Sequence, residues 1–139
     1  MECFKTFRKA PPSQLIMTLL VKNEESMLEE NLLFHKAMGV DSFIITDNNS
    51  TDSTPEIIRK YKQKGWIKEV IEEKATDYEQ KEWVDRMIWK AKTIYKADWI
   101  INADADELWY SPSGNLKTDL SATHANVLNC EMRSVYPEE

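Results

Sequence analysis

Two aspartates one residue apart, Asp104 and Asp106, are the residues of this sequence best suited to hold a cation. They follow the apolar stretch Trp-Ile-Ile-Asn-Ala, and side chains alternate along a strand, so both carboxylates are expected to point the same way. Converging carboxylates repel each other unless a cation or protons intervene, and hard oxygen ligands suit Mg²⁺ or Mn²⁺. The pair therefore predicts a Mg²⁺ or Mn²⁺ site whose coordination shell a diphosphate completes. The alternative for a short Asp-x-Asp stretch is a solvated acidic turn.

A third carboxylate, Asp47, ends the apolar stretch Ser-Phe-Ile-Ile-Thr. If both stretches are parallel strands, Asp47 lies on the same sheet edge as Asp104 and can accept hydrogen bonds from a base or a ribose. The alternative is that residues 47–49 simply form a turn, which Asp and Asn favour. Residues 22–25, Lys-Asn-Glu-Glu, match no glycine-rich phosphate loop, so phosphates must be bound in another way, which fits a metal.

The elements that must position these acids follow an alternating strand and helix order, which predicts an α/β fold with a mostly parallel sheet. Leu15–Val21 is a nearly continuous apolar run, typical of a strand covered on both faces. The predicted strands are residues 15–21, 42–46, 66–71, 98–103 and 126–135. Ligands of such sheets bind at the carboxyl ends of the strands, where Asp47 and the Asp104 pair are expected.

Three helices are predicted between the first four strands. The first is expected to be capped by Asn23 and to end at Gly39, and the second to be capped by Ser53 or Thr54 and to end at Gly65. The third helix is expected to begin with a capping pair of Asp77 and Gln80. Its apolar face repeats at helical spacing and should pack on the sheet, through Trp83, Met87, Ala91 and Ile94.

Composition narrows the class of protein. A chain of 139 residues with 42% hydrophobic residues can form one domain with a real core, and a net charge of -6 argues against nucleic-acid binding. Cys3 and Cys130 are too few for a disulfide framework and lack zinc-ligand spacing, so reduced thiols are expected. The first 14 residues hold no apolar core of a signal peptide, and residues 15–21 are far too short to span a membrane. We therefore expect a cytoplasmic protein with at most peripheral membrane association.

Three motifs occur in chain order: Leu-Leu-Val-Lys-Asn-Glu-Glu at 19–25, Ile-Ile-Thr-Asp-Asn-Asn-Ser-Thr-Asp at 44–52 and Trp-Ile-Ile-Asn-Ala-Asp-Ala-Asp-Glu at 99–107. Together they resemble the family 2 glycosyltransferases. The last is closest to the subgroup with an Asp-x-Asp-Glu motif. The resemblance implies a Rossmann-like GT-A fold whose helices sandwich the sheet. It also implies one domain, in which residues 1–14 are an extension, residues 15–110 bind the nucleotide sugar, and residues 111–139 begin the acceptor side.

The resemblance implies specific roles. Val21 and Asn23 would lie beside the base, and Asp47 would contact it. Asp104 would approach the ribose or the waters of the metal, and Asp106 would coordinate the metal directly. The implied reaction is a metal-dependent transfer of a sugar, with inversion, from a nucleotide diphosphate sugar to an acceptor hydroxyl. A UDP-sugar is the expected donor, with Mn²⁺ or Mg²⁺ as cofactor.

Other residues have two interpretations. Glu24 lies near the same edge and either contacts the ligand or has a structural role in helix capping or packing. Arg86 either reaches a phosphate or is a solvated charge beside Asp85. His35 is expected to have a structural role, and Trp109 is the tryptophan to test for stacking on a sugar or base.

The sequence also departs from the resemblance. Asn48 stands where the family usually has a second Asp, which leaves the base preference open. No residue convincingly fits the general base that such a transfer needs: Glu131, Glu138 and Glu139 are late acids, and the last two lie at the untethered chain end. We therefore expect the donor-binding half of a longer enzyme. The alternatives are a non-catalytic module that binds a nucleotide sugar or metal, and a receiver-like signalling domain, whose arrangement of Asp and Lys at strand ends is not matched here.

Overall fold

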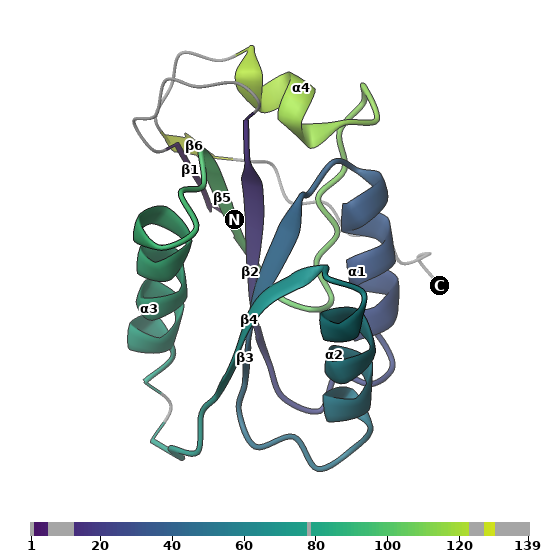
Figure 1. The fold of residues 1–139 in the computed structure, drawn as a ribbon, viewed down its shortest axis with the longest axis vertical. Helices are drawn as coiled ribbons and strands as arrows, with labels where there is room; N and C mark the ends of the chain where they lie inside the picture. Colours follow the sequence, from purple (N-terminus) through teal and green to yellow (C-terminus); the bar gives the residue numbers. More distant parts are fainter. Residues whose placement is uncertain (1, 6–12, 78, 123–126, 130–139) are drawn as a thin grey trace, which may run out of the picture.

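One mixed β-sheet forms the centre of the fold (Figure 1). The computed structural model describes residues 2–5, 13–77, 79–122 and 127–129. Within these residues six strands lie in the order β4-β3-β2-β5-β1-β6. The strands are β1 (Glu2–Lys5), β2 (Leu15–Val21), β3 (Ser42–Asp47), β4 (Ile67–Glu72), β5 (Trp99–Ala103) and β6 (Val127–Asn129). The helices are α1 (Leu28–Ala37), α2 (Thr54–Gln63), α3 (Gln80–Thr93) and α4 (Leu116–Ser121).

The four strands β4, β3, β2 and β5 are parallel, and their register brings the predicted site to one edge. Val21, the last residue of β2, pairs with Asp47 at the end of β3, and Leu19 pairs with Ala103 at the end of β5. Because the carboxyl ends of parallel strands meet at the same edge, the loops that follow β2, β3 and β5 are neighbours. Strand β1 is antiparallel to both β5 and β6.

Helices cover both faces of the sheet, as the apolar run of β2 predicts. In Figure 1, α1 and α2 lie on one face and α3 lies on the other. Leu15, Met17 and Leu19 belong to the core cluster that includes Leu28 and Leu32 of α1. The alternate residue Ile16 belongs to a second cluster with side chains of α3, among them Met87 and Ala91. The first four predicted strands and the predicted sandwich are therefore confirmed.

Two elements were not predicted, and the structure describes only part of one predicted strand. Residues 2–5, expected to be part of an extension, form β1 beside β5. Leu116–Ser121 forms α4, whose N-cap Asn115 accepts a hydrogen bond from the backbone N–H of Thr118. Of the predicted strand 126–135, residues 127–129 form β6, and the others, Cys130 among them, lie outside the described residues.

The predicted helix starts were less accurate than the strands. Asn23 does not cap α1, because the helix begins at Leu28 and Met27 occupies the N-cap position. Ser53 is the N-cap of α2, but it makes no side-chain capping bond there. The Asp77 and Gln80 capping pair is wrong, because Glu79 is the N-cap and Gln80 is already helical.

The ends of the helices follow the prediction more closely. Gly39 and Gly65 follow α1 and α2 with φ angles of 101° and 81°, so both predicted glycine stops are confirmed. On α3, Trp83, Met87 and Ala91 are buried as predicted, whereas Ile94 is 51% exposed just past the end of the helix. Among the described residues, no helix has both the length and the apolar character needed to cross a membrane.

Candidate functional site

Acidic residues lie in the loops at the carboxyl edge of the parallel strands, and three of them are close enough to Glu24 to affect its pKa. The pKa of Glu24 is raised above its usual value, mainly by partial burial and then by repulsion from the carboxylates of Asp106, Asp104 and Asp52. These acids come from three different loops, which follow β2, β3 and β5. Glu24, which had two interpretations from the sequence, therefore lies among the acids of the site.

The acidic loop, residues 104–109, continues directly from β5. Asp104 and Asp106 are exposed, whereas Ala105 between them is only 1% exposed and belongs to the core. The alternation expected of an extended chain thus places both carboxylates on the solvent side. Partial desolvation and the repulsion from Asp106 raise the pKa of Asp104. This mutual repulsion is the property that a bound cation would relieve.

The acids do not form a complete protein cage for a metal. Among the described residues, no group of three or more His, Cys, Asp or Glu side chains is arranged to hold a metal ion. Glu107 is engaged within the loop, because its Oε1 accepts the backbone N–H of Asp104 at 2.7 Å. A divalent ion at Asp104 and Asp106 would take its other ligands from water and substrate oxygens, which is the usual pattern for Mg²⁺.

A buried pair of polar side chains on α1 lies beneath the acidic loop. Asn31 and His35 are both fully buried, and Nδ1 of His35 lies 3.0 Å from Oδ1 of Asn31. Asn31 hydrogen-bonds to carbonyl oxygens of the loop, and the backbone N–H of Trp109 donates to Nε2 of His35 at 2.8 Å. His35 thus has the structural role that the sequence predicted. Asn31 was missed, although two polar residues four apart on a buried helix face were a signal that they share contacts.

The loop after β3 combines both predicted interpretations. Asp47 is half-buried, and its Oδ1 accepts the backbone N–H of Ser50 at 3.2 Å, so it does stabilise a turn. Asn48 is 7% exposed, and its Nδ2 donates to the carbonyl oxygens of Glu73 (3.0 Å) and Ala75 (2.9 Å). Asn48 therefore anchors the loop after β4 through its side-chain amide.

The loops after β2 and β3 are linked by hydrogen bonds. Oδ1 of Asn23 accepts the backbone N–H of Thr51 at 2.7 Å, and the backbone N–H of Asn23 donates to Oγ of Ser50. Glu25 accepts hydrogen bonds from both the backbone N–H and the hydroxyl of Ser53. Val21 is buried in the core, and its carbonyl accepts the backbone N–H of Asn48. The predicted contacts of Val21 and Asn23 with a nucleotide base stay predictions. Because Oδ1 of Asn23 accepts from Thr51, Nδ2 is the atom of this side chain that could donate to a base.

Arg86 lies on α3 and forms an ion pair with Glu73, with Nη2 and Oε2 2.5 Å apart. This bond lowers the pKa of Glu73. The Nε atom of Arg86 is buried and has no hydrogen-bond partner among the described residues. Arg86 is thus more than a solvated charge beside Asp85, and its contact with a phosphate stays a prediction.

The aromatic residues near the site differ from expectation. Trp109 is only 5% exposed and packs in the main core cluster, so its ring has no open face for a sugar or base. Tyr110, the next residue, is 72% exposed, and Leu108 is 39% exposed. The exposed apolar surface next to the acids therefore comes from Leu108 within the acidic loop and Tyr110 just after it, neither of which was predicted from the sequence.

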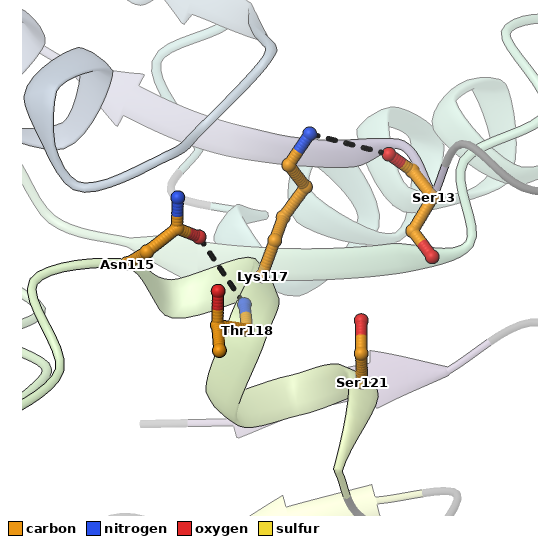
Figure 2. A pocket seen from close by; sticks show the side chains of 5 residues that line it. All are labelled: Ser13, Asn115, Lys117, Thr118 and Ser121. Atoms are coloured by element: carbon orange, nitrogen blue, oxygen red, sulfur yellow. Dashed lines mark hydrogen bonds between the residues drawn. The ribbon is translucent and has the colours of Figure 1, made fainter.

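An open pocket of about 360 Å³ lies at the other edge of the sheet, before β2 begins. It is lined by Ser13, Asn115, Lys117, Thr118 and Ser121 (Figure 2). Figure 2 shows Nζ of Lys117 reaching the carbonyl oxygen of Ser13, and the same Nζ forms an ion pair with Asp41 at 3.0 Å. These contacts attach α4 to the residues before β2 and β3, so the pocket lies at the edge opposite the acidic loop, and the ammonium group of Lys117 has structural partners.

Solved structures show the same fold. The S. aureus TarS 1-349 crystal structure aligns with a TM-score of 0.60 at 18% identity, over 78% of this chain and 31% of that one. The mannosyltransferase PcManGT from Pyrobaculum calidifontis, in complex with GDP-Man and Mn²⁺, aligns with a TM-score of 0.51 at 20% identity, over 70% of this chain and 29% of that one. The chain thus spans about a third of their length. These likenesses confirm the predicted GT-A type α/β fold.

The sequence comparisons decide the family. No curated protein sequence matches this chain significantly. The family model described as Glycosyltransferase family 92 matches residues 17–129, which include all three motifs. The predicted class of glycosyltransferases is confirmed, whereas the narrower assignment to family 2 and its Asp-x-Asp-Glu subgroup is not. The chain belongs to glycosyltransferase family 92.

Proposed function

We propose that this chain is the donor-binding part of a metal-dependent glycosyltransferase, which transfers a sugar from a nucleotide diphosphate sugar to an acceptor hydroxyl. The observation that carries the proposal is the position of Asp104 and Asp106, which are exposed directly after β5, near Glu24, at the edge where α/β sheets bind their ligands. Membership of a glycosyltransferase family supports the reaction class. The complex of PcManGT with GDP-Man and Mn²⁺ supports a divalent ion and a nucleotide sugar on this fold.

Each acid has a proposed role. Asp106 coordinates the ion directly, and Asp104 binds the ribose or the waters of the ion. A divalent ion, when bound, neutralises the negative charge that develops on the departing diphosphate. Glu24 contributes negative charge from the facing loop, which strengthens attraction for a cation. Repulsion among these acids favours the cation-bound state over the empty one.

The nucleoside is proposed to bind beside the linked loops. Asp47 contacts the base or ribose with the oxygen that the Ser50 amide leaves free. Val21 and Asn23 border the same position, and Arg86 reaches a phosphate through the guanidinium atoms that Glu73 does not occupy. UDP is the proposed nucleotide, and transfer with inversion is the proposed stereochemistry. The residue that deprotonates the acceptor is not assigned.

Calorimetry tests the binding step. Wild-type chain is titrated with UDP in the presence of Mn²⁺, in the presence of Mg²⁺ and after chelation of divalent ions, with GDP as the base control. Asp106→Ala should weaken the metal-dependent binding by more than about tenfold. The matched control is Asp119→Ala, which removes an exposed acid of α4 at the other edge. UDP binding that persists after chelation, or that survives Asp106→Ala, would contradict the proposal.

The second candidate is a binding module without turnover, since the acids near Glu24 could hold a metal and a diphosphate whether or not a transfer follows. Incubation with a UDP-sugar separates the two functions. Release of free sugar or its transfer to an added acceptor would support an enzyme active in this chain alone. Metal-dependent binding with no loss of donor over many hours would support the module.

A further inference from the structure

Two uncharged side chains of α1 hydrogen-bond to the backbone of the acidic loop on its buried side. Asn31 and His35 lie one turn apart on α1, and neither side chain is exposed. In Figure 1 the segment that follows β5 runs beside α1, as these bonds require. Nδ2 of Asn31 donates to three carbonyl oxygens of the loop, those of Asp104 (3.3 Å), Ala105 (3.0 Å) and Glu107 (3.0 Å).

The hydrogen-bond roles in this pair follow from the chemistry of its groups. Because Nδ2 of Asn31 is the donor to the loop, Oδ1 of Asn31 must accept, and Nδ1 of His35 therefore carries a proton. Nε2 of His35 is then the acceptor for the backbone N–H of Trp109. The neutral ring with its proton on Nδ1 satisfies both contacts at once, and no polar atom of either side chain lacks a partner.

These bonds determine the direction in which the carboxylates point. Carbonyl oxygens at both ends of a four-residue stretch turn toward one amide group, so the backbone of the loop curves around Asn31. Ala105 is drawn into the core at 1% exposure, and the residues on either side of it project outward. The His35 contact with Trp109 fixes the far end of the curve. Asn31 and His35 thus orient the carboxylates of Asp104 and Asp106 through bonds to the loop backbone, without contacting the carboxylates themselves.

We propose that Asn31 and His35 are positioning residues, which hold the acidic loop in the one curvature that keeps the carboxylates of Asp104 and Asp106 convergent for a divalent ion and a diphosphate. This inference rests on the proposed function. Partners that orient metal ligands from behind commonly change metal affinity by about 10- to 100-fold when they are removed. A loop with several curvatures would have to be ordered upon binding, at a cost in affinity.

Three variants test the proposal by calorimetry of Mn²⁺ with UDP. His35→Leu removes the acceptor for the Trp109 amide, whereas His35→Gln retains a side-chain carbonyl that can accept it. Asn115→Ala is the control for stability, because it removes the cap of α4 at the other edge of the sheet. Each variant is measured at a temperature where circular dichroism shows it to be fully folded. We expect His35→Leu to weaken binding at least about tenfold, His35→Gln to recover most of the loss, and Asn115→Ala to bind as the wild type does.

The outcomes separate this inference from the proposed function. If the folded His35→Leu protein binds Mn²⁺ and UDP as tightly as the wild type, the residue only stabilises the fold and the inference is overturned, while the proposed function stands. If His35→Leu and His35→Gln are equally weak, the acceptor for the Trp109 amide is not the cause, and the inference is again overturned. If the wild type binds no UDP with Mn²⁺ or Mg²⁺, both the proposed function and the inference fail.

Discussion

Lowering the pH from 7 to 5 should destabilise this protein through His35. Burial lowers the pKa of His35 from its ordinary 6.5 to about 4. The neutral ring is also required by its contacts, because a second proton on Nε2 would face the backbone N–H of Trp109. In the unfolded chain the ring is solvated and regains its ordinary pKa. The two states therefore differ in proton uptake over the intervening range of pH.

The sign and size of the effect follow from this difference. The folded pKa lies below the unfolded one, so the unfolded state binds the proton first as the pH falls. The stabilising contribution of neutral His35 is complete above pH 6.5 and is lost as the pH falls through 6.5 toward 4. A shift of this size corresponds to about 3 kcal/mol of unfolding free energy in total. About 2 kcal/mol of it should be lost between pH 7 and pH 5.

Urea unfolding of the wild type and His35→Gln at pH 7, 6 and 5 measures the effect. Only the wild type should show the loss of about 2 kcal/mol assigned to His35, so the difference between the two proteins isolates it. The raised pKa values of Glu24 and Asp104 act in the opposite direction, but they are present in both proteins and cancel. Equal losses in the two proteins would refute the reasoning. So would an NMR titration that places the folded pKa of His35 near 6.5.

Three further predictions concern the loops. Asn48→Asp should lower the free energy of unfolding by about 1–3 kcal/mol, because a carboxylate would face two carbonyl oxygens, and urea unfolding would show it. Gly39→Ala should cost more than Gly65→Ala in the same assay: both incur left-handed strain of roughly 1–2 kcal/mol, but only at Gly39 would the added Cβ lie 2.7 Å from the side chain that caps α4. Asp106→Asn should lower the pKa of Asp104 toward its ordinary value, measured by carboxyl NMR titration, and an unchanged pKa would mean that these side chains do not interact.

The strands could be predicted because the local pattern agrees with the global fold. Leu15–Val21 is apolar on both faces, and both faces are covered by helices. From this run and the predicted strand 42–46 it follows that Asp47 lies at the carboxyl edge, and the register of β2 and β3 places it there. That Asp104 and Asp106 follow β5 at the same edge was predictable for the same reason, since it requires only that the strands be parallel.

The remaining features depend on partners distant in the sequence. Glu2–Lys5 is too short for its periodicity to indicate a strand, and its place beside β5 depends on a distant pairing, that of Glu2 with Asn102. The sequence shows that Asn48 is a polar residue in a turn, but not that its amide reaches carbonyl oxygens 25 and 27 residues away. The ion pair of Arg86 with Glu73 was hidden in the same way, because Asp85 is the nearer acid in sequence.

Helix starts failed for a related physical reason. The residues that looked like caps are used to join loops, as Asn23 accepts from the backbone of Thr51 rather than from α1. Asn, Ser and Asp bond equally well to any nearby backbone donor, so their type alone does not indicate which one they choose. At this edge the loops are close enough to compete with the helices for caps. The failed cap predictions thus cluster where the candidate site lies.

The two side chains that hold the acidic loop, Asn31 and neutral His35, are uncharged, and this suits a loop that carries carboxylates. The carboxyl pKa values of Glu24 and Asp104 are raised, so the charged forms are less favourable in the folded state and their contribution to stability is lost as the pH rises through these values. A lysine or arginine could bind the same carbonyl oxygens and would relieve this repulsion. Its positive charge would also weaken the negative potential that attracts a divalent ion. An amide and a neutral imidazole anchor the backbone and leave that field unchanged, which is why an uncharged pair suits a loop whose carboxylates must remain available.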